Sequence, residues 1–212
     1  MRRATLTLVA AGLALWARGA HAEYATRLYA GAAMSPFWSG THATVGREEL
    51  GEGEGFDFGL ELGASRTLVG RFLAARAALL LSEWSTDFAR ASGQRRWHFD
   101  VTVGPEALVP VHKATFRFFL PFGYSNAWIR TRPGRAVRDD YTGGHGIAFG
   151  LLAAIDMYGD HHGATLGLGY VGRYHWFEHE TTLIRTPSSR ATERYRITTH
   201  AAVFSGGYAV RF

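Results

Sequence analysis

The chain has 212 residues, a formal net charge of +5 at pH 7 and no cysteine. The missing cysteines exclude a disulfide-stapled fold and a lipid-modified lipoprotein anchor. Glycine (26 residues) and aromatic residues (14%) are abundant, yet mean hydropathy is only −0.08, which argues against a helical membrane protein and suits strands with one apolar and one polar face.

The N-terminus has the three parts of a secretory signal. Arg2 and Arg3 form a basic region, residues 6–16 form a short apolar run, and Ala20-His21-Ala22 matches an A-x-A cleavage site. We therefore predict a signal peptide over residues 1–22 and one mature domain over residues 23–212. Cleavage removes three arginines and no acid, so the mature charge is 20 − 18 = +2, which gives no reason to expect a nucleic-acid partner.

Eight segments of alternating apolar and polar residues follow, each with the side-chain period of two that defines a strand. The clearest sets Phe56, Phe58 and Leu60 against Asp57 and Glu61. The predicted strands cover roughly 26–34, 56–65, 73–82, 97–104, 116–125, 147–157, 165–176 and 199–212.

The predicted connections alternate in length. Long polar ones cover 35–55, 85–96, 130–144 and 178–194. Short ones cover 65–70 and 158–163, with a further turn near 112–114, where Pro105 and Pro110 blur the strand ends. An even strand count with this asymmetry places both termini and all short turns on the periplasmic side of a membrane.

Aromatic residues independently indicate where the membrane–water interfaces lie. All tryptophans of the mature chain fall where a predicted strand meets a long connection, as an outer aromatic girdle would require: Trp38, Trp84, Trp97, Trp128 and Trp176. Four further aromatic residues near the short turns would form the inner girdle: Phe72, Phe116, Tyr158 and Phe212.

The C-terminal segment carries Tyr208, Val210 and Phe212 on its apolar face. A terminal aromatic on such a strand resembles the C-terminal strand of bacterial outer-membrane barrels. With the eight alternating segments, the mature chain resembles the small eight-stranded outer-membrane barrels, such as the OmpX type and the transmembrane part of OmpA. The resemblance implies an all-β, eight-stranded antiparallel up-and-down transmembrane β-barrel in the outer membrane, whose last strand is read by the outer-membrane assembly machinery.

Charges on the polar strand faces are predicted to point into the barrel: Asp57, Glu61, Arg76, Asp100, Arg117, Asp156 and Arg173. An eight-stranded barrel is just wide enough for side chains to fill it. Mixed signs then favour a plug of buried ion pairs, while the alternative is a pathway for ions.

Three patterns could carry other chemistry. His175 and His179 match H-x-x-E-H, but four residues of strand separate them by roughly 13 Å, too far for one zinc ion. Gly167–Gly172 matches G-x-G-x-x-G, yet it lies inside a strand. A lipid A-modifying enzyme would use a serine beside a histidine, and the candidates are His98, His145 and His175 with Ser82 and Ser125.

We therefore expect a structural or surface-interaction role: membrane integrity, or binding of lipopolysaccharide or external surfaces by the loops. Arginines of the third and fourth loops suit lipopolysaccharide phosphates: Arg130, Arg132, Arg135, Arg138, Arg185, Arg190 and Arg194. The first alternative is a narrow channel for ions or small solutes, and the second is a lipid A-modifying enzyme. Catalysis, a cofactor and a bound metal are not expected.

Overall fold

The computed structural model describes residues 26–43, 49–69, 71–86, 94–131, 140–182 and 190–212, without the side chains of the strand residues nearest the long connections. The predicted signal peptide, at 1–22, lies outside this part. Nine antiparallel β-strands make up the described fold: β1 (Thr26–Ala43), β2 (Glu49–Val69), β3 (Leu73–Thr86), β4 (Gln94–Val111), β5 (Ala114–Phe119), β6 (Phe122–Thr131), β7 (Asp140–Tyr158), β8 (His162–Thr182) and β9 (Arg190–Arg211). Within these ranges no helix is long and apolar enough to cross a membrane.

The nine strands form a ring of eight, because β5 and β6 are two halves of one barrel strand. Phe119 pairs with Glu106 and Phe122 with Val103. A gap of three residues between β5 and β6 thus matches a gap of three residues on β4. The same holds against β7, where Phe119 pairs with Leu152 and Phe122 with Phe149. Pro121 has no N–H to donate to the ladder, and this accounts for the interruption without a shift of register.

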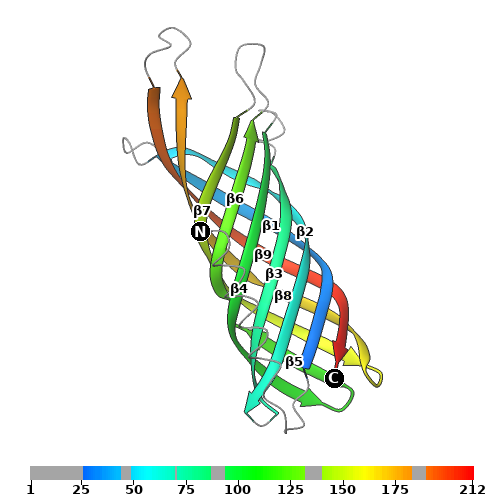
Figure 1. The fold of residues 1–212 in the computed structure, drawn as a ribbon. Helices are drawn as coiled ribbons and strands as arrows, with labels where there is room; N and C mark the ends of the chain where they lie inside the picture. Colours follow the sequence, from blue (N-terminus) through cyan, green and yellow to red (C-terminus); the bar gives the residue numbers. More distant parts are fainter. Residues whose placement is uncertain (1–25, 44–48, 70, 87–93, 132–139, 183–189) are drawn as a thin grey trace.

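The ring closes between the first and last strands (Figure 1). β1 pairs with β9 from Arg27–Arg211 to Ala43–Tyr195, and β3 pairs with β4 from Leu73–Ala107 to Trp84–Arg96. Every pairing is antiparallel between neighbours in the ring. A closed sheet satisfies its backbone polar groups internally, which is what a membrane-spanning barrel requires. The predicted eight-stranded antiparallel barrel is confirmed.

Short turns lie at one end of the barrel and the longer connections at the other (Figure 1). The turn at His112–Lys113 lies where expected, and His112 adopts a left-handed φ of 51°. The predicted long connections are wrong in extent, because strand pairing continues far into them: β1 reaches Ala43, β8 reaches Thr182, and Thr182 pairs with Arg190. Polar residues continue these strands beyond the apolar belt, where alternation no longer marks a lipid face.

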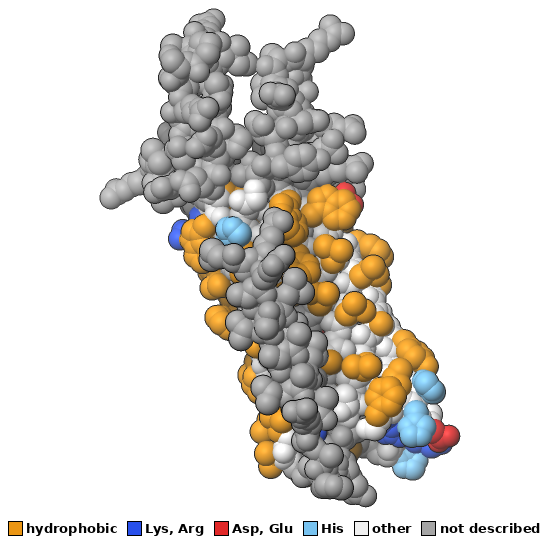
Figure 2. Space-filling model, viewed as in Figure 1, with side chains coloured by type: hydrophobic (Ala, Val, Ile, Leu, Met, Phe, Trp, Pro, Cys, Tyr) orange, Lys and Arg blue, Asp and Glu red, His pale blue; other side chains and the backbone are white. Residues whose placement is uncertain are grey.

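The outer wall is broadly apolar (Figure 2). Exposed side chains include Phe58 (63%), Leu60 (62%) and Phe122 (60%), which is the lipid face of a transmembrane barrel. Tyr208, Val210 and Phe212 lie on this face, with Tyr208 and Phe212 exposed and Val210 half-buried.

Four predicted girdle tryptophans are exposed on the wall near the long connections: Trp38, Trp97, Trp128 and Trp176. The side chain of Trp84 lies outside the described part; its backbone pairs with Asp57. At the short-turn end, Phe72, Phe116 and Phe212 are exposed, but the assignment of Tyr158 to the inner girdle is wrong. Tyr158 is buried and its hydroxyl donates to Asp156 Oδ2 at 3.0 Å, because both residues share the inward parity of β7.

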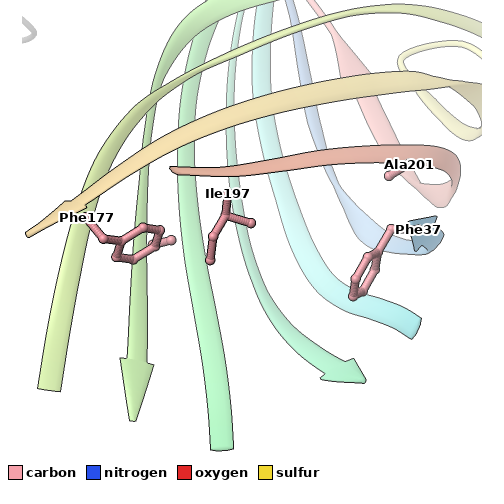
Figure 3. Close-up of a cluster of buried hydrophobic side chains, with 5 residues drawn as sticks. Phe37, Phe177, Ile197 and Ala201 are labelled. Carbon is pink, nitrogen blue, oxygen red and sulfur yellow. The ribbon is translucent and has the colours of Figure 1, made fainter. Parts of the chain in front are cut away.

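Apolar side chains fill three levels of the interior. Near the long connections, Phe37, Ala127, Phe177, Ile197 and Ala201 form one cluster, shown in Figure 3. Halfway along, Ala33, Val171 and Val203 pack with Leu80 and Leu152. Near the short turns, Tyr29, Tyr158 and Ala209 form the third. Polar side chains occupy the spaces between these levels.

Candidate functional site: the polar clusters of the lumen

Two groups of buried polar side chains lie in the lumen, one toward each end. The loop-side cluster lies nearer the long connections, and its members are at most 3% exposed: Asp57, Ser82, His98, Asp100, Ser125, Arg173 and His175. The turn-side cluster lies nearer the short turns: Glu61, Ser65, Arg76, Glu106, Arg117 and Asp156. Asp100 and Glu106 are six residues apart on β4, so their Cα atoms lie about 20 Å apart along the strand.

The loop-side cluster joins strands that are not neighbours in the ring. Arg173 on β8 donates from Nε to Asp100 Oδ2 on β4 at 2.7 Å, and its Nη1 lies 3.8 Å from Asp57 Oδ2 on β2. His98 Nε2 lies 3.0 Å from the same Asp57 oxygen. These contacts therefore reach across the lumen from β8 to β4 and β2.

Two serine–histidine contacts belong to this cluster. Ser82 Oγ lies 2.5 Å from His98 Nε2, and Ser125 Oγ lies 2.7 Å from His175 Nε2. A hydrolytic triad needs the histidine to reach the serine with one ring nitrogen and the acid with the other. Here His98 faces both Ser82 and Asp57 with Nε2, while Ser125 donates directly to Asp100. The candidate serines and histidines do contact each other, but they are arranged as packed polar side chains and not as a catalytic triad.

Glu106 is the centre of the turn-side cluster. It is fully buried, and its carboxylate receives a hydrogen bond from Ser65 and two from arginines: Arg117 Nη1 at 2.9 Å and Arg76 Nη1 at 3.5 Å. Arg76 also donates to Glu61 from Nη2. A carboxylate buried this deeply is stable only when paired and hydrogen-bonded.

Arg117 ties this cluster across the barrel. Its Nε lies 2.8 Å from Asp156 Oδ2 on β7, and its Nη2 donates to Thr165 Oγ1 on β8 at 2.8 Å. The guanidinium carbon also lies 4.1 Å from the centre of the Tyr29 ring on β1, which adds a cation–π contact. One side chain thus connects β5 to β1, β4, β7 and β8.

The apolar cluster of Ala33, Val171 and Val203 separates the two polar clusters. A cavity of about 40 Å³ remains there, lined by Glu61, Asp100 and apolar neighbours, and a second of about 20 Å³ lies beside Arg117. A buried water needs roughly 10–15 Å³, so these spaces suit one or a few waters. In the described part of the chain they do not amount to a passage for hydrated ions.

All seven charges predicted to face the lumen lie there, distributed over the two clusters. Glu106 was not predicted from the sequence, because Pro105 and Pro110 obscured the strand. Alternate residues of β4, such as Asp100 and Thr102, face the lumen, and continuing that alternation reaches Glu106. It also missed the apolar middle layer. The H-x-x-E-H and G-x-G-x-x-G patterns both fall within β8, as expected, and the side chain of His179 lies outside the described part.

Three histidines pair with tyrosines on the outer wall. His145 Nδ1 lies 2.5 Å from the Tyr124 hydroxyl, and Asn126 lies beside it. His200 Nδ1 lies 2.5 Å from the Tyr170 hydroxyl, and its ring stacks on Trp38. His162 and Tyr208 repeat the pairing at the short-turn end. His145 was a candidate for catalysis, but its exposed position on the wall separates it from both serines.

The closed antiparallel ring, the apolar wall and the girdle of exposed tryptophans together define an outer-membrane-type transmembrane β-barrel. Solved structures agree with this class. The outer membrane protein OprG from Pseudomonas aeruginosa aligns with a TM-score of 0.52 and 10% identity, over 91% of this chain and 97% of that one. A major outer membrane protein from Thermus thermophilus gives 0.50 and 11%, over 85% and 99%.

The outer membrane protease OmpT from Escherichia coli gives a TM-score of 0.51 and 6% identity, over 89% of this chain and 96% of that one. No protein-family model matches the sequence, and no curated protein matches it either. Identities this low establish the barrel fold and leave the function to be argued from the chain itself.

Proposed function

We propose that the protein is a closed outer-membrane barrel with a structural and surface-presenting role, and that it is not an enzyme. The observation that carries this proposal is the filled lumen: two clusters of buried ion pairs, an apolar layer between them, and small cavities of about 20 and 40 Å³ beside these groups. In a barrel filled in this way, the outer wall and the loops are the surfaces available for binding partners.

Outer-membrane lipid and lipopolysaccharide are the partners that this role implies. The exposed Trp38, Trp128 and Trp176 and the His145–Tyr124 and His200–Tyr170 pairs offer stacking and hydrogen bonding at headgroup level. The arginine-rich loops named above would contact phosphates beyond that level. The outward Tyr208 and Phe212 support recognition of the last strand by the assembly machinery.

Burial of the serine–histidine pairs speaks against lipid A chemistry. Ser125 and His175 are fully buried, and the Phe37–Ile197 apolar cluster packs in the lumen on the loop side. A substrate acyl chain would have to displace that cluster before reaching a serine.

Cells that lack the protein and cells that carry wild type or Ser125→Ala provide the test. We expect deletion to increase uptake of a hydrophobic dye across the outer membrane, and both genes to restore the barrier equally. Lipid A masses should be identical in all strains. A change in lipid A mass that follows Ser125, with unchanged dye uptake, would contradict the structural role and favour an enzyme.

A further inference from the structure

The lumen ends at the short turns in a group of positive charges, centred on Arg27. This side chain is 9% exposed, and its Nε and Nη1 atoms are buried without a hydrogen-bond partner. Within the described residues, no carboxylate lies within ion-pair distance of it. A buried guanidinium without an anion is costly, so its presence at this position calls for a negatively charged partner.

Arg211 brings a second guanidinium to the same place. Its backbone lies opposite that of Arg27 in the β1–β9 ladder, so both side chains are on the inward face of the barrel. Its Nε donates to the carbonyl of Asp160 at 2.8 Å, and its guanidinium carbon lies 4.7 Å from the centre of the buried Tyr158 ring. Arg211 is therefore held at the rim of the barrel, beside Arg27.

The neighbouring acids are already engaged. Glu61 pairs with Arg76, Glu106 with Arg76 and Arg117, and Asp156 with Arg117. With Arg27 and Arg211 included, four arginines face three carboxylates at this end of the lumen. The rim adds Arg66, Arg71 and Lys113 against Asp160 and the terminal carboxylate of Phe212, which lies beside Thr26. The local charge is thus positive, with the surplus at the mouth.

We infer that the short-turn mouth of the barrel binds an oxyanion, with Arg27 and Arg211 as its ligands. Phosphate is the chemistry that fits, because two guanidinium groups can each present paired N–H donors to its oxygens. Such a group can come from free phosphate in solution or from a phospholipid headgroup at the membrane surface. The site lies at the opposite end of the barrel from the long loops and is independent of their proposed role.

The test uses inorganic phosphate and the folded protein in neutral alkyl-maltoside micelles, against sodium chloride of equal ionic strength. At about five times the dissociation constant, binding should raise the melting temperature of the wild type by about 2–4 °C. Arg27→Gln should melt higher than wild type without phosphate, since it removes an unpaired buried charge, and should lose the response. Lys113→Gln, an exposed turn cation at the same end, should respond like wild type.

A second readout follows the Arg27 Nε–H signal by nitrogen NMR, which should shift with phosphate whatever the stability of the variants. Vesicles of phosphatidylcholine with or without phosphatidylglycerol distinguish the lipid source: an Arg27-dependent stabilisation there, without one by free phosphate, assigns the site to a headgroup. Equal responses of wild type and Arg27→Gln, or no response in either arm, would overturn the inference.

Discussion

Replacing Arg117 by alanine removes the side chain that ties the turn-side cluster together. Arg117 is 2% exposed and makes three polar contacts of 2.8–2.9 Å, two of them to the buried carboxylates of Glu106 and Asp156. Losing one partner of a buried ion pair costs about 3–5 kcal/mol. Arg117→Ala also removes a charge-assisted hydrogen bond to Glu106, at about 1.5–3 kcal/mol, and the ion pair with Asp156, so it should lower the free energy of unfolding by about 3–5 kcal/mol.

The free energy is measured by urea titration of the protein in lipid vesicles, with tryptophan fluorescence as the signal. Lys113→Ala, which removes an exposed turn cation, should change it by less than about 0.5 kcal/mol. The double variant Arg117→Met with Asp156→Asn should recover much of the loss, because it leaves fewer unpaired charges buried. A loss below about 1 kcal/mol for Arg117→Ala would show that water screens the pair, as on a protein surface, and would refute a dry, closed lumen.

Three further predictions concern the wall, the packing and the orientation of the barrel. Leu60→Arg, on the lipid face near mid-height, should cost about 2–4 kcal/mol in the same titration, whereas Leu68→Arg, on the same face near the short turns, should cost about 0–1 kcal/mol; equal costs would mean that β2 does not face lipid. Gly207→Ala should cost about 1–3 kcal/mol, because its new Cβ would meet the Ala30 carbonyl oxygen and, at 2.6 Å, Gly31 Cα. Gly206→Ala should be nearly silent in that titration, because its Cβ would meet only Leu166 Cδ2, at 3.6 Å; similar losses for both would contradict the packing. Arg135→Cys and Arg190→Cys should react with a membrane-impermeant thiol reagent on intact cells while His161→Cys should not, and the reverse pattern would invert the topology.

The barrel could be predicted from sequence because alternation is strong wherever one face meets lipid. Phe56, Phe58 and Leu60 are all exposed on the wall, and Asp57 lies in the lumen, as the pattern requires. Beyond the membrane both faces are polar and the alternation disappears. Backbone pairing continues there, so the predicted β1 and β8 end too early and the predicted β2 and β9 begin too late.

The interior could be predicted only in part. Charged residues of inward parity were identified, because a charge on the lipid side would be costly. Apolar residues of inward parity gave no such signal: Leu80 and Leu152 look like lipid-facing residues in sequence, yet they pack in the middle of the lumen. Tyr158 was misplaced for a related reason, since an aromatic ring near a turn fits either face. Contacts across the barrel, such as Arg173–Asp100, depend on side-chain positions that alternation does not specify.

The closed lumen is the central claim, and single-channel recording in planar bilayers tests it most directly. Ion pairs cross the barrel at two levels with an apolar layer between them, and the proposed closed role requires that no continuous aqueous path runs through the lumen. Wild type that shows the heat-dependent gel shift of a folded barrel should therefore produce no discrete conductance steps above the bare bilayer in molar potassium chloride. Stable, reproducible openings from the same folded protein would contradict the filled lumen and support a channel.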